Sequence, residues 1–322
     1  MNKLSSILND NYQLLYLDNP KYFLDTIINT NILYRDNLNL NNNITFGLEI
    51  EYQFFNRHLV DEYIKKHYVT WTSKKEDTIK MGGEISSPKL RDNFNTWQDL
   101  AAICKFLRLI HAKIAENTAG HVHVGASILE LDVKKWRNFY KIYMLYEGIL
   151  RRFFAGEYIN LRKSSHEYAK PLAYELYKNL ALINSDSLLD YCGFGNKQMA
   201  LNCSYAKYRY SKELFHFRDT IEFRSPNGTL SEVIWQNNVN AIVKLIYRCT
   251  QELDEEYLDY LIEHWSYKDY QSDCVFIDDA LQFVDLVFDN NLDKTYFLRQ
   301  YFKNMESNLN YQALIKTKKF YR

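Results

Sequence analysis

Three short segments of the chain place charged or metal-binding side chains two residues apart, within runs that have the composition of β-strands. The pairs are Glu49 and Glu51, His121 and His123, and Glu222 and Arg224. In a strand, residues i and i+2 lie on the same face of the sheet. Each pair therefore shares one face, and apolar neighbours occupy the other. Carboxylates and imidazoles on one face are donors for divalent metal ions, and a guanidinium beside them is a partner for phosphate.

A further segment, Gly82-Gly-Glu-Ile-Ser-Ser-Pro88, adds one more carboxylate at Glu84. If the strands pair in one sheet, four acids from three segments converge on its polar face. Hard cations such as Mg²⁺ and Mn²⁺ prefer carboxylate oxygens, and Mg²⁺ usually shares them with nucleotide phosphates. The chain has no Walker A sequence and no G-x-G-x-x-G, and it contains only ten glycines. The phosphates of a nucleotide would therefore be held by metal ions and side chains.

Each motif also has a purely structural explanation. Glu-x-Glu is common on exposed strand faces, and Glu222 and Arg224 in isolation are explained by a same-face salt bridge. The two histidines carry more information because the chain has only eight, and Gly120 and Gly125 beside them permit close approach of the backbone. The joint pattern carries the prediction, because every strand with clear alternation has the same chemistry on its polar face.

The composition limits the classes of protein and partner. The chain has 322 residues, 47% of them apolar and 25% charged, with a formal net charge of zero. Nucleic acid and anionic membranes require a basic field, so we expect neither as a partner. The five cysteines form no C-x-x-C pair, which predicts reduced thiols. No signal peptide or membrane span is recognisable, and we expect a cytoplasmic protein.

The elements that must position these residues follow from periodicity and turn signals. Strands are predicted at 44–55, 67–72, 84–88 and around His121 and Glu222, with short strands at 199–205 and 208–210. Helices are predicted within 1–40 and at 95–114, 132–154, 232–252, 255–264, 277–288 and 293–305, with a loop at 160–170. Thr96 is the predicted N-cap of the 95–114 helix. Strands and long helices do not alternate one for one, which favours the α+β class.

In this order, the segments resemble the carboxylate–amine ligases of the glutamine synthetase and glutamate–cysteine ligase fold, and in particular the putative amidoligase family. The resemblance covers about residues 44–245. It implies a curved antiparallel sheet with helices packed on its outer face and the catalytic site on the concave face. The expected regions are an N-terminal helical extension (1–43), a ligase-like catalytic core (44–245) and a C-terminal helical region packed on the core (246–322).

The resemblance also implies roles for individual residues. Metal ligands are expected at Glu49, Glu51, Glu84, His121 and Glu222. Phosphate contacts are expected from His123 and Arg224, and the reaction itself would depend on Glu49, Glu222 and Arg224. The variable substrate region of the family offers Arg151, Arg152 and Arg162 as bidentate partners for an acceptor carboxylate. Arginines at such positions are more often solvated or ion-paired, so this assignment is open.

The predicted function is ATP-dependent formation of an amide or peptide bond through an acyl phosphate, with ATP and Mg²⁺ or Mn²⁺ as cofactors. The substrates would be a carboxylate and an amine carried by an amino acid, peptide or protein, and oligomerisation is left open. One alternative is a metallohydrolase or cupin-like metalloenzyme that uses His121, His123 and one glutamate as a three-ligand site. Another is a non-catalytic nucleotide-binding relative.

Overall fold

The structure is a computed structural model that describes residues 10–303, except 159, 192, 208–218 and 267–274. Six strands form one sheet in the order β2-β3-β1-β4-β6-β5, and each neighbouring pair is antiparallel. The strands are β1 (Phe46–Gln53), β2 (Thr72–Lys74), β3 (Gly82–Ser86), β4 (Gly120–Gly125), β5 (Leu201–Asn202) and β6 (Thr220–Phe223). The α+β class is confirmed.

Helices precede, separate and follow the strands. The first are α1 (Tyr12–Asp18), α2 (Pro20–Asn29), α3 (Arg57–His67), α4 (Phe94–Leu109) and the short 3-10 helix η2 (Ala126–Leu129). Between β4 and β6 lie α5 (Val133–Phe154), α6 (Ser165–Tyr168), α7 (Ala173–Lys178), α8 (Leu180–Ile183), α9 (Leu188–Tyr191) and α10 (Ser204–Lys207). The last are α11 (Glu232–Arg248), α12 (Glu255–Glu263), α13 (Ile277–Val287) and α14 (Asn291–Tyr301).

The apolar face of the sheet packs against helices, as the alternation in the strands predicts. The apolar residues at alternate positions are almost fully buried, among them Leu48, Ile50, Ile85, Val122, Val124, Ile221 and Phe223. From α4, Trp97 stacks on Phe46 of β1 with ring centroids 5.5 Å apart. From α5, Phe139 and Tyr143 meet the ring of Phe223 edge-on. Burial of this face fixes which side of the sheet remains for polar residues.

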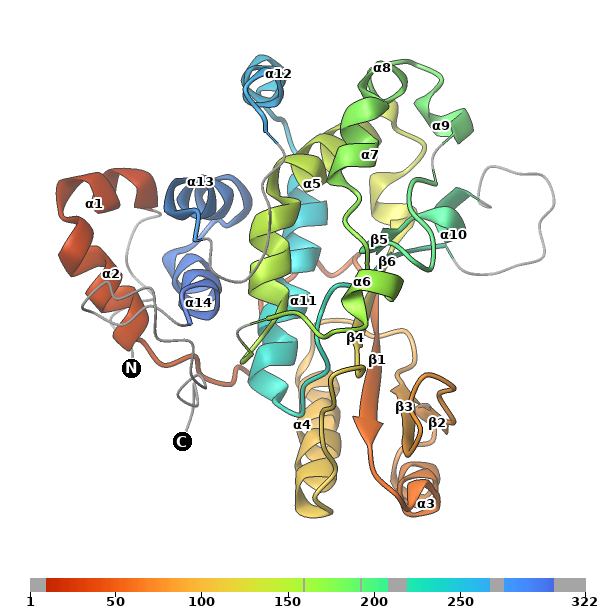
Figure 1. Ribbon diagram of the computed structural model, residues 1–322. Coiled ribbons are helices and arrows are strands. Elements are labelled where there is room, and N and C mark those ends of the chain that lie inside the picture. The colour runs from red at the N-terminus through yellow and green to blue at the C-terminus, as the bar shows by residue number, and fades with distance from the viewer. Residues whose placement is uncertain (1–9, 159, 192, 208–218, 267–274, 304–322) are drawn as a thin grey trace.

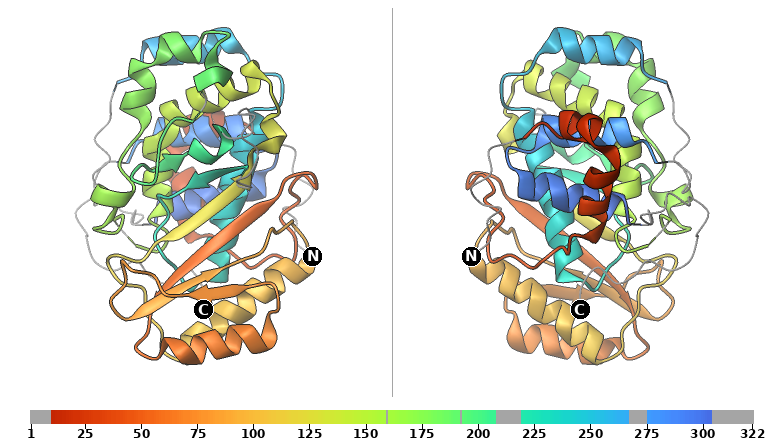
Figure 2. Two further views of the ribbon diagram at one scale, coloured as in Figure 1. Left: turned by 90° about the vertical axis from the view of Figure 1, so that its right-hand side faces the viewer. Right: turned by 90° about the vertical axis from the view of Figure 1, so that its left-hand side faces the viewer.

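The elements form layers. Figure 1 shows α5 and α11 between the sheet on one side and α1, α2, α13 and α14 on the other. Figure 2 shows β1 and β4 crossing the molecule obliquely, with α3 and α4 at one end of the sheet. The N-terminal and C-terminal helices are joined directly, because the Tyr12 hydroxyl lies 2.8 Å from Thr295 Oγ1. One large apolar core extends from Tyr12 to Phe302, and a small second cluster lies around Ile32 and Ile234. The division into three regions stays a prediction.

Several predicted boundaries need correction. The predicted strand at 67–72 is wrong, because α3 ends at His67 and the edge strand β2 begins only at Thr72. The apolar side of α3, with Val60 and Ile64 buried, keeps the chain helical up to His67, and a turn at residues 69–70 follows. The N-cap of α4 is Asn93 and not Thr96, since Asn93 Oδ1 accepts a hydrogen bond from the Thr96 amide at 3.0 Å.

The remaining predicted helices agree with the structure. The helices predicted at 132–154, 232–252, 255–264, 277–288 and 293–305 correspond to α5, α11, α12, α13 and α14. The predicted loop at 160–170 contains the short α6, and the strand predicted at 208–210 lies outside the described residues. Three of the five cysteines are described, and all three are buried and form no disulfide. No helix among the described residues has the length and apolar character needed to cross a membrane.

One buried carboxylate ties α5 to the segment that follows the predicted loop. Glu147 of α5 is fully buried and accepts hydrogen bonds from the backbone amides of Leu172 and Ala173 and from the Tyr143 hydroxyl. Beside it, Arg151 donates to the carbonyl of Ala169 at 2.6 Å. These contacts hold residues 169–173 in place, at the start of α7.

We predict that Glu147→Ala lowers the free energy of unfolding by about 3 kcal/mol or more, because three buried donors lose their acceptor and each such loss costs roughly 1–3 kcal/mol. Urea unfolding measures the change. Glu147→Gln keeps one acceptor oxygen and should lose less. Glu263→Ala, which removes an exposed carboxylate, serves as the control and should change stability by at most about 0.5 kcal/mol. Equal stability of Glu147→Ala and the control would contradict this account.

Candidate functional site

The register of the sheet brings the predicted site residues together on one face. Directly paired positions are Glu51 with Glu84, Glu49 with His121, and His123 with Glu222. Residues that face each other across an antiparallel pair point to the same side of the sheet. The acids and histidines from four strands therefore form one continuous polar surface, opposite to the face that packs on α4 and α5.

Glu49 and Glu222 form the centre of this surface, with the two histidines between them. His121 Nδ1 lies 2.9 Å from Glu49 Oε2 and 3.8 Å from Glu222 Oε1. His123 Nε2 lies 3.3 Å from Glu49 Oε1. On its outer side, Glu222 accepts hydrogen bonds from Arg224 and, at 2.8 Å, from the side-chain amide of Asn202. Both carboxylates are thus surrounded by nitrogen donors.

Glu51 and Glu84 form a second pair of acids toward β2. Glu51 Oε2 accepts a hydrogen bond from the Ala119 amide at 2.6 Å. Glu84 Oε1 accepts from Ser86 Oγ at 2.6 Å and lies 3.0 Å from Lys74 Nζ. Both glutamates are nearly fully buried. Each of these acids therefore has at least one specific donor, which offsets part of the cost of burying a charge.

A cavity of about 670 Å³ lies over this surface and takes in the central residues and the second acid pair. It collects Glu49, Glu51, Glu84, His121, His123, Glu222 and Arg224, together with Arg162. The other lining residues come from four places along the chain: residues 74–78, 117–119, 164–168 and 197–205. The polar face of the sheet is therefore the floor of a cavity, and the predicted convergence of the acids is observed.

The pKa values of the acids on the cavity floor are shifted in different directions. Burial acts to raise the pKa of Glu49, but the hydrogen bonds and charges of His121 and His123 outweigh it and hold the pKa well below its usual range. For Glu222, burial is likewise outweighed by the charges of His121 and Arg224, and the pKa is lowered. Burial raises the pKa of Glu51, and the charge of His121 offsets only part of that effect.

The floor contains a set of atoms that suits a divalent cation. Among the described residues, the donor atoms of Glu49, His123 and Glu222 lie within 4.8 Å of one another. Two carboxylates and one imidazole form an oxygen-rich set, which fits Mg²⁺ or Mn²⁺ better than the sulfur- or imidazole-rich sets that select softer metals. The imidazole in this set is that of His123, whereas the resemblance implies His121 as the metal ligand. His121 Nδ1 contacts Glu49 Oε2 at 2.9 Å.

The three candidate arginines lie in different surroundings, and only one of them lines the cavity. Arg162 lines the cavity and is about 94% buried. Arg151 and Arg152 are not among the lining residues. They lie in the last turn of α5, where Arg151 donates to Ala169 O and Arg152 donates to Tyr301 O at 3.0 Å. These contacts connect α5 to neighbouring segments, and neither arginine lines the cavity that holds the acids.

The sequence did not indicate several residues of the cavity. The sequence does not indicate Lys74, because the predicted second strand ends before it. The register of β2 and β3 places Lys74 opposite Glu84. Asn202 lies inside the short predicted strand at 199–205, but nothing in that run marked it as a partner of Glu222. The close backbone approach that is expected at Gly120 is present in the structure. A Cβ at Gly120 would lie 2.8 Å from Asn227 O, so the glycine permits close packing of the chain on itself.

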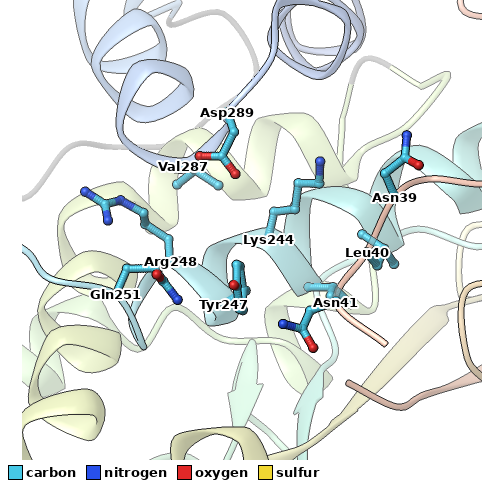
Figure 3. A pocket seen from close by; sticks show the side chains of 10 residues that line it. Asn39, Leu40, Asn41, Lys244, Tyr247, Arg248, Gln251, Val287 and Asp289 are labelled. Atoms are coloured by element: carbon cyan, nitrogen blue, oxygen red, sulfur yellow. The ribbon is translucent and has the colours of Figure 1, made fainter. Parts of the chain in front are cut away.

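A separate cavity of about 400 Å³ lies away from the sheet, between residues 39–41, the C-terminal part of α11 and the end of α13 (Figure 3). Its basic residues are Lys244 and Arg248 of α11. Lys244 Nζ lies 2.5 Å from Asp293 Oδ2, and Arg248 donates to the carbonyls of Leu286 and Glu252. None of the sequence-predicted site residues lines this cavity.

The comparisons with known proteins identify a family. A family model described as "Putative amidoligase enzyme" matches residues 58–246, more than half of the chain. The matched range contains Glu84, both histidines, Glu222 and Arg224. Strand β1, with Glu49 and Glu51, precedes it. No curated protein matches the chain.

The lowered pKa of Glu49 predicts a pH dependence of stability in metal-free buffer. A carboxyl whose pKa is lower in the folded state stabilises the fold above its unfolded pKa of about 4.3, and this contribution is lost as the pH falls toward the folded pKa. Between about pH 5 and pH 3, the unfolding free energy should fall by up to about 1.4 kcal/mol per pH unit for this one group.

Glu49→Gln should flatten that slope, because the amide does not titrate. Urea unfolding across this pH range, with chelator present, measures it for the wild type, for Glu49→Gln and for Glu263→Gln, whose carboxylate is exposed. The last variant should keep the wild-type slope. An unchanged slope in Glu49→Gln would show that Glu49 is not held by the histidines in the folded state.

Proposed function

Because the chain belongs to the family described as putative amidoligase enzymes, we propose that it is an ATP-dependent carboxylate–amine ligase. The observation that carries the proposal is the joint placement of Glu49, His123, Glu222 and Arg224 on the floor of one cavity. A metal-binding set next to a guanidinium is suited to the phosphates of a nucleotide. The proposal includes the glutamine synthetase-like fold that the resemblance implies.

In the proposed reaction, a carboxylate oxygen of one substrate attacks the γ-phosphorus of ATP. An O–P bond forms, ADP leaves, and the product is an acyl phosphate. The nitrogen of an amine then attacks the acyl carbon. A C–N bond forms, the C–O bond to phosphate breaks with its electron pair on phosphate, and the nitrogen loses a proton. Bound Mg²⁺ or Mn²⁺ would supply neutralisation of the phosphate charge and alignment of its oxygens.

The residues of the chain would do the positioning. Glu49, His123 and Glu222 would hold one metal ion. Glu51 and Glu84 offer carboxylates for a second, on the side of Lys74. His121 would fix the rotamer of Glu49 through its 2.9 Å contact. Arg224, anchored by Glu222 and by Tyr168 O at 3.4 Å, would contact the transferred phosphoryl group.

The donor set argues against the metallohydrolase or cupin-like alternative. That alternative requires His121, His123 and one glutamate to converge. Among the described residues, the set that converges has only one of the two histidines and two carboxylates. It would also leave the acid pair Glu51 and Glu84 without a function. No contact in the cavity specifically favours a non-catalytic role.

We predict that ATP binding requires a divalent cation. Three buried carboxylates, the half-buried carboxylate of Glu49 and a triphosphate repel one another in a partly dehydrated cavity unless cations lie between them. Calorimetry should therefore find ATP binding with Mg²⁺ or Mn²⁺ and a loss of affinity of at least about tenfold in chelator. Glu222→Gln should reduce the metal-dependent affinity, while Glu263→Gln should not. Equal ATP affinity with and without metal would overturn this site assignment.

Arg224→Lys should slow the chemical step more than it weakens ATP binding. Lysine keeps the charge but lacks the planar fork that contacts two phosphoryl oxygens, and these contacts matter most while charge spreads over them during transfer. We expect kcat for ADP formation to fall at least about tenfold, equivalent to roughly 1.4 kcal/mol.

The control for this variant is Arg91→Lys, at an exposed arginine outside the cavity. Circular dichroism establishes that both proteins are folded. An unchanged kcat with a raised KM for ATP would assign Arg224 to nucleotide binding alone. Unchanged kcat and KM would remove it from the phosphate site.

A further inference from the structure

A lysine ends one row of acids at the edge of the sheet. Lys74 is the last residue of β2, and the register places it directly opposite Glu84, which in turn lies opposite Glu51. Residues that face each other across antiparallel strands point to the same side of the sheet. Lys74, Glu84 and Glu51 therefore form one row across β2, β3 and β1, and all three line the cavity over the sheet.

The charged end of Lys74 contacts the acids of this row. Its Nζ lies 3.0 Å from Glu84 Oε1, and its charge also interacts with those of Glu49 and Glu76. The lysine side chain is 55% exposed, whereas that of Glu84 is only 4% exposed. The ammonium therefore reaches a buried carboxylate from the rim of the cavity, on a flexible stem that allows another cation to displace it.

The backbone that carries Lys74 is held by its neighbours. β2 is the edge strand next to β3 and packs against α3. Beside Lys74, Ser73 Oγ donates a hydrogen bond to Asp61 Oδ1 of α3 at 2.7 Å. Asp61 Oδ2 in turn lies 3.3 Å from a guanidinium nitrogen of Arg57, one turn earlier in the helix. The start of the lysine side chain therefore has a defined position, from which its ammonium reaches Glu84.

The acid pair that Lys74 faces differs from the three donors proposed to hold the first metal ion. Among the described residues, the set of three donors that converge does not include Glu51 or Glu84. The Ala119 amide donates to Oε2 of Glu51, while Ser86 and Lys74 engage Oε1 of Glu84. Each of the two carboxylates has a second oxygen, and hard divalent cations bind such oxygens. The pair can therefore take a divalent ion, but an ammonium already lies at one of its two acids.

A second divalent ion and the ammonium of Lys74 compete for the same carboxylate. Their charges would lie within a few ångströms of each other in a buried place, where like charges repel strongly. The acids at the rim of the cavity offer weaker alternatives to the ion. Asp77 and Glu167 are exposed. Glu76 accepts hydrogen bonds from the amide and the hydroxyl of Thr78 in exposed surroundings. Water and salt screen charges at such positions, so the second ion would bind at the buried pair and must displace Lys74 there.

We propose that Lys74 competes with a second divalent ion for Glu84, so that the protein without nucleotide binds one divalent ion firmly and a second one only weakly. This inference deepens the proposed function and rests on the metal site of that proposal. Lys74 acts on the number of bound ions through its positive charge, and it holds no ion itself. The protein therefore carries, in its own chain, a cation at the place that Glu51 and Glu84 offer to the second metal.

Binding of Mn²⁺ tests the competition without any need for turnover. Electron paramagnetic resonance measures free Mn²⁺ while the protein is titrated without nucleotide at neutral pH. The wild type should bind one Mn²⁺ at least about tenfold more tightly than a second. Lys74→Met removes the ammonium but keeps an unbranched side chain, and it should bind the second Mn²⁺ at least about tenfold more tightly than the wild type does. Equal affinity for the second ion in these two proteins would overturn the proposal.

Three further variants show whether the effect is local to Lys74 and Glu84. Lys75→Met removes the neighbouring lysine, which pairs with Asp77 and does not line the cavity, and it should bind both ions like the wild type. Lys74→Arg keeps the positive charge and should keep the second ion weakly bound. Adding Glu84→Gln to Lys74→Met should remove the gain in affinity. A gain in Lys75→Met as large as that in Lys74→Met, or a gain that survives Glu84→Gln, would overturn the proposal. Circular dichroism establishes that all the variants are folded.

The two ions separate this inference from the proposed function. The first ion tests the metal site of the ligase, and Glu222→Gln should weaken it. If the first ion binds in this way and Lys74→Met leaves the second unchanged, the metal site of the ligase stands and the role of Lys74 is wrong. If the wild type binds no Mn²⁺ but Lys74→Met binds one ion that Glu84→Gln abolishes, the competition by Lys74 stands and the first metal site is wrong. Absence of bound Mn²⁺ in every protein would overturn both.

Discussion

The site depends on one constraint, the antiparallel register of β1, β4 and β6. This register pairs Glu49 with His121 and His123 with Glu222. The side-chain period of a strand is two, so a slip of one residue in any pairing would turn the acids into the apolar layer and the apolar residues into the cavity. Burial of Val122 and Phe223 against α5 and α11 makes such a slip costly. The same packing that stabilises the core therefore fixes the positions of the donors.

The second requirement is that buried acids have partners. Four carboxylates on one face repel one another, and each is costly to bury without compensation. The structure meets this cost locally: Glu49 contacts both histidines, Glu222 contacts Arg224 and Asn202, Glu84 contacts Lys74 and Ser86, and Glu51 contacts the Ala119 amide. The partners come from different strands and loops. The floor is thus held in its arrangement before any ligand binds, which is the condition for electrostatic preorganisation.

How much of the site can be predicted from the sequence depends on these two requirements. Alternation within a strand is local, so the shared face of His121 and His123 was visible from the sequence. Pairing between strands is not local, because Glu49 and His121 are 72 positions apart and only the folded core sets their register. The second strand is predicted too early because residues 68–71 are of types with strand propensity. In the structure, α3 and the turn after it occupy this segment. Arg151, Arg152 and Arg162 have identical chemistry, and only tertiary packing distinguishes the one that lines the cavity.

The composition of the metal set has a consequence for the whole sheet. Glu49, His123 and Glu222 belong to β1, β4 and β6, and more than 170 positions separate the first from the last. These donors meet only when the three strands are paired, so the unfolded chain has no comparable site. A cation held by this set binds the folded state and not the unfolded one, and it stabilises the sheet by mass action. In the proposed metal site, affinity for the metal and integrity of the central sheet would be one property, because each strand would contribute one ligand.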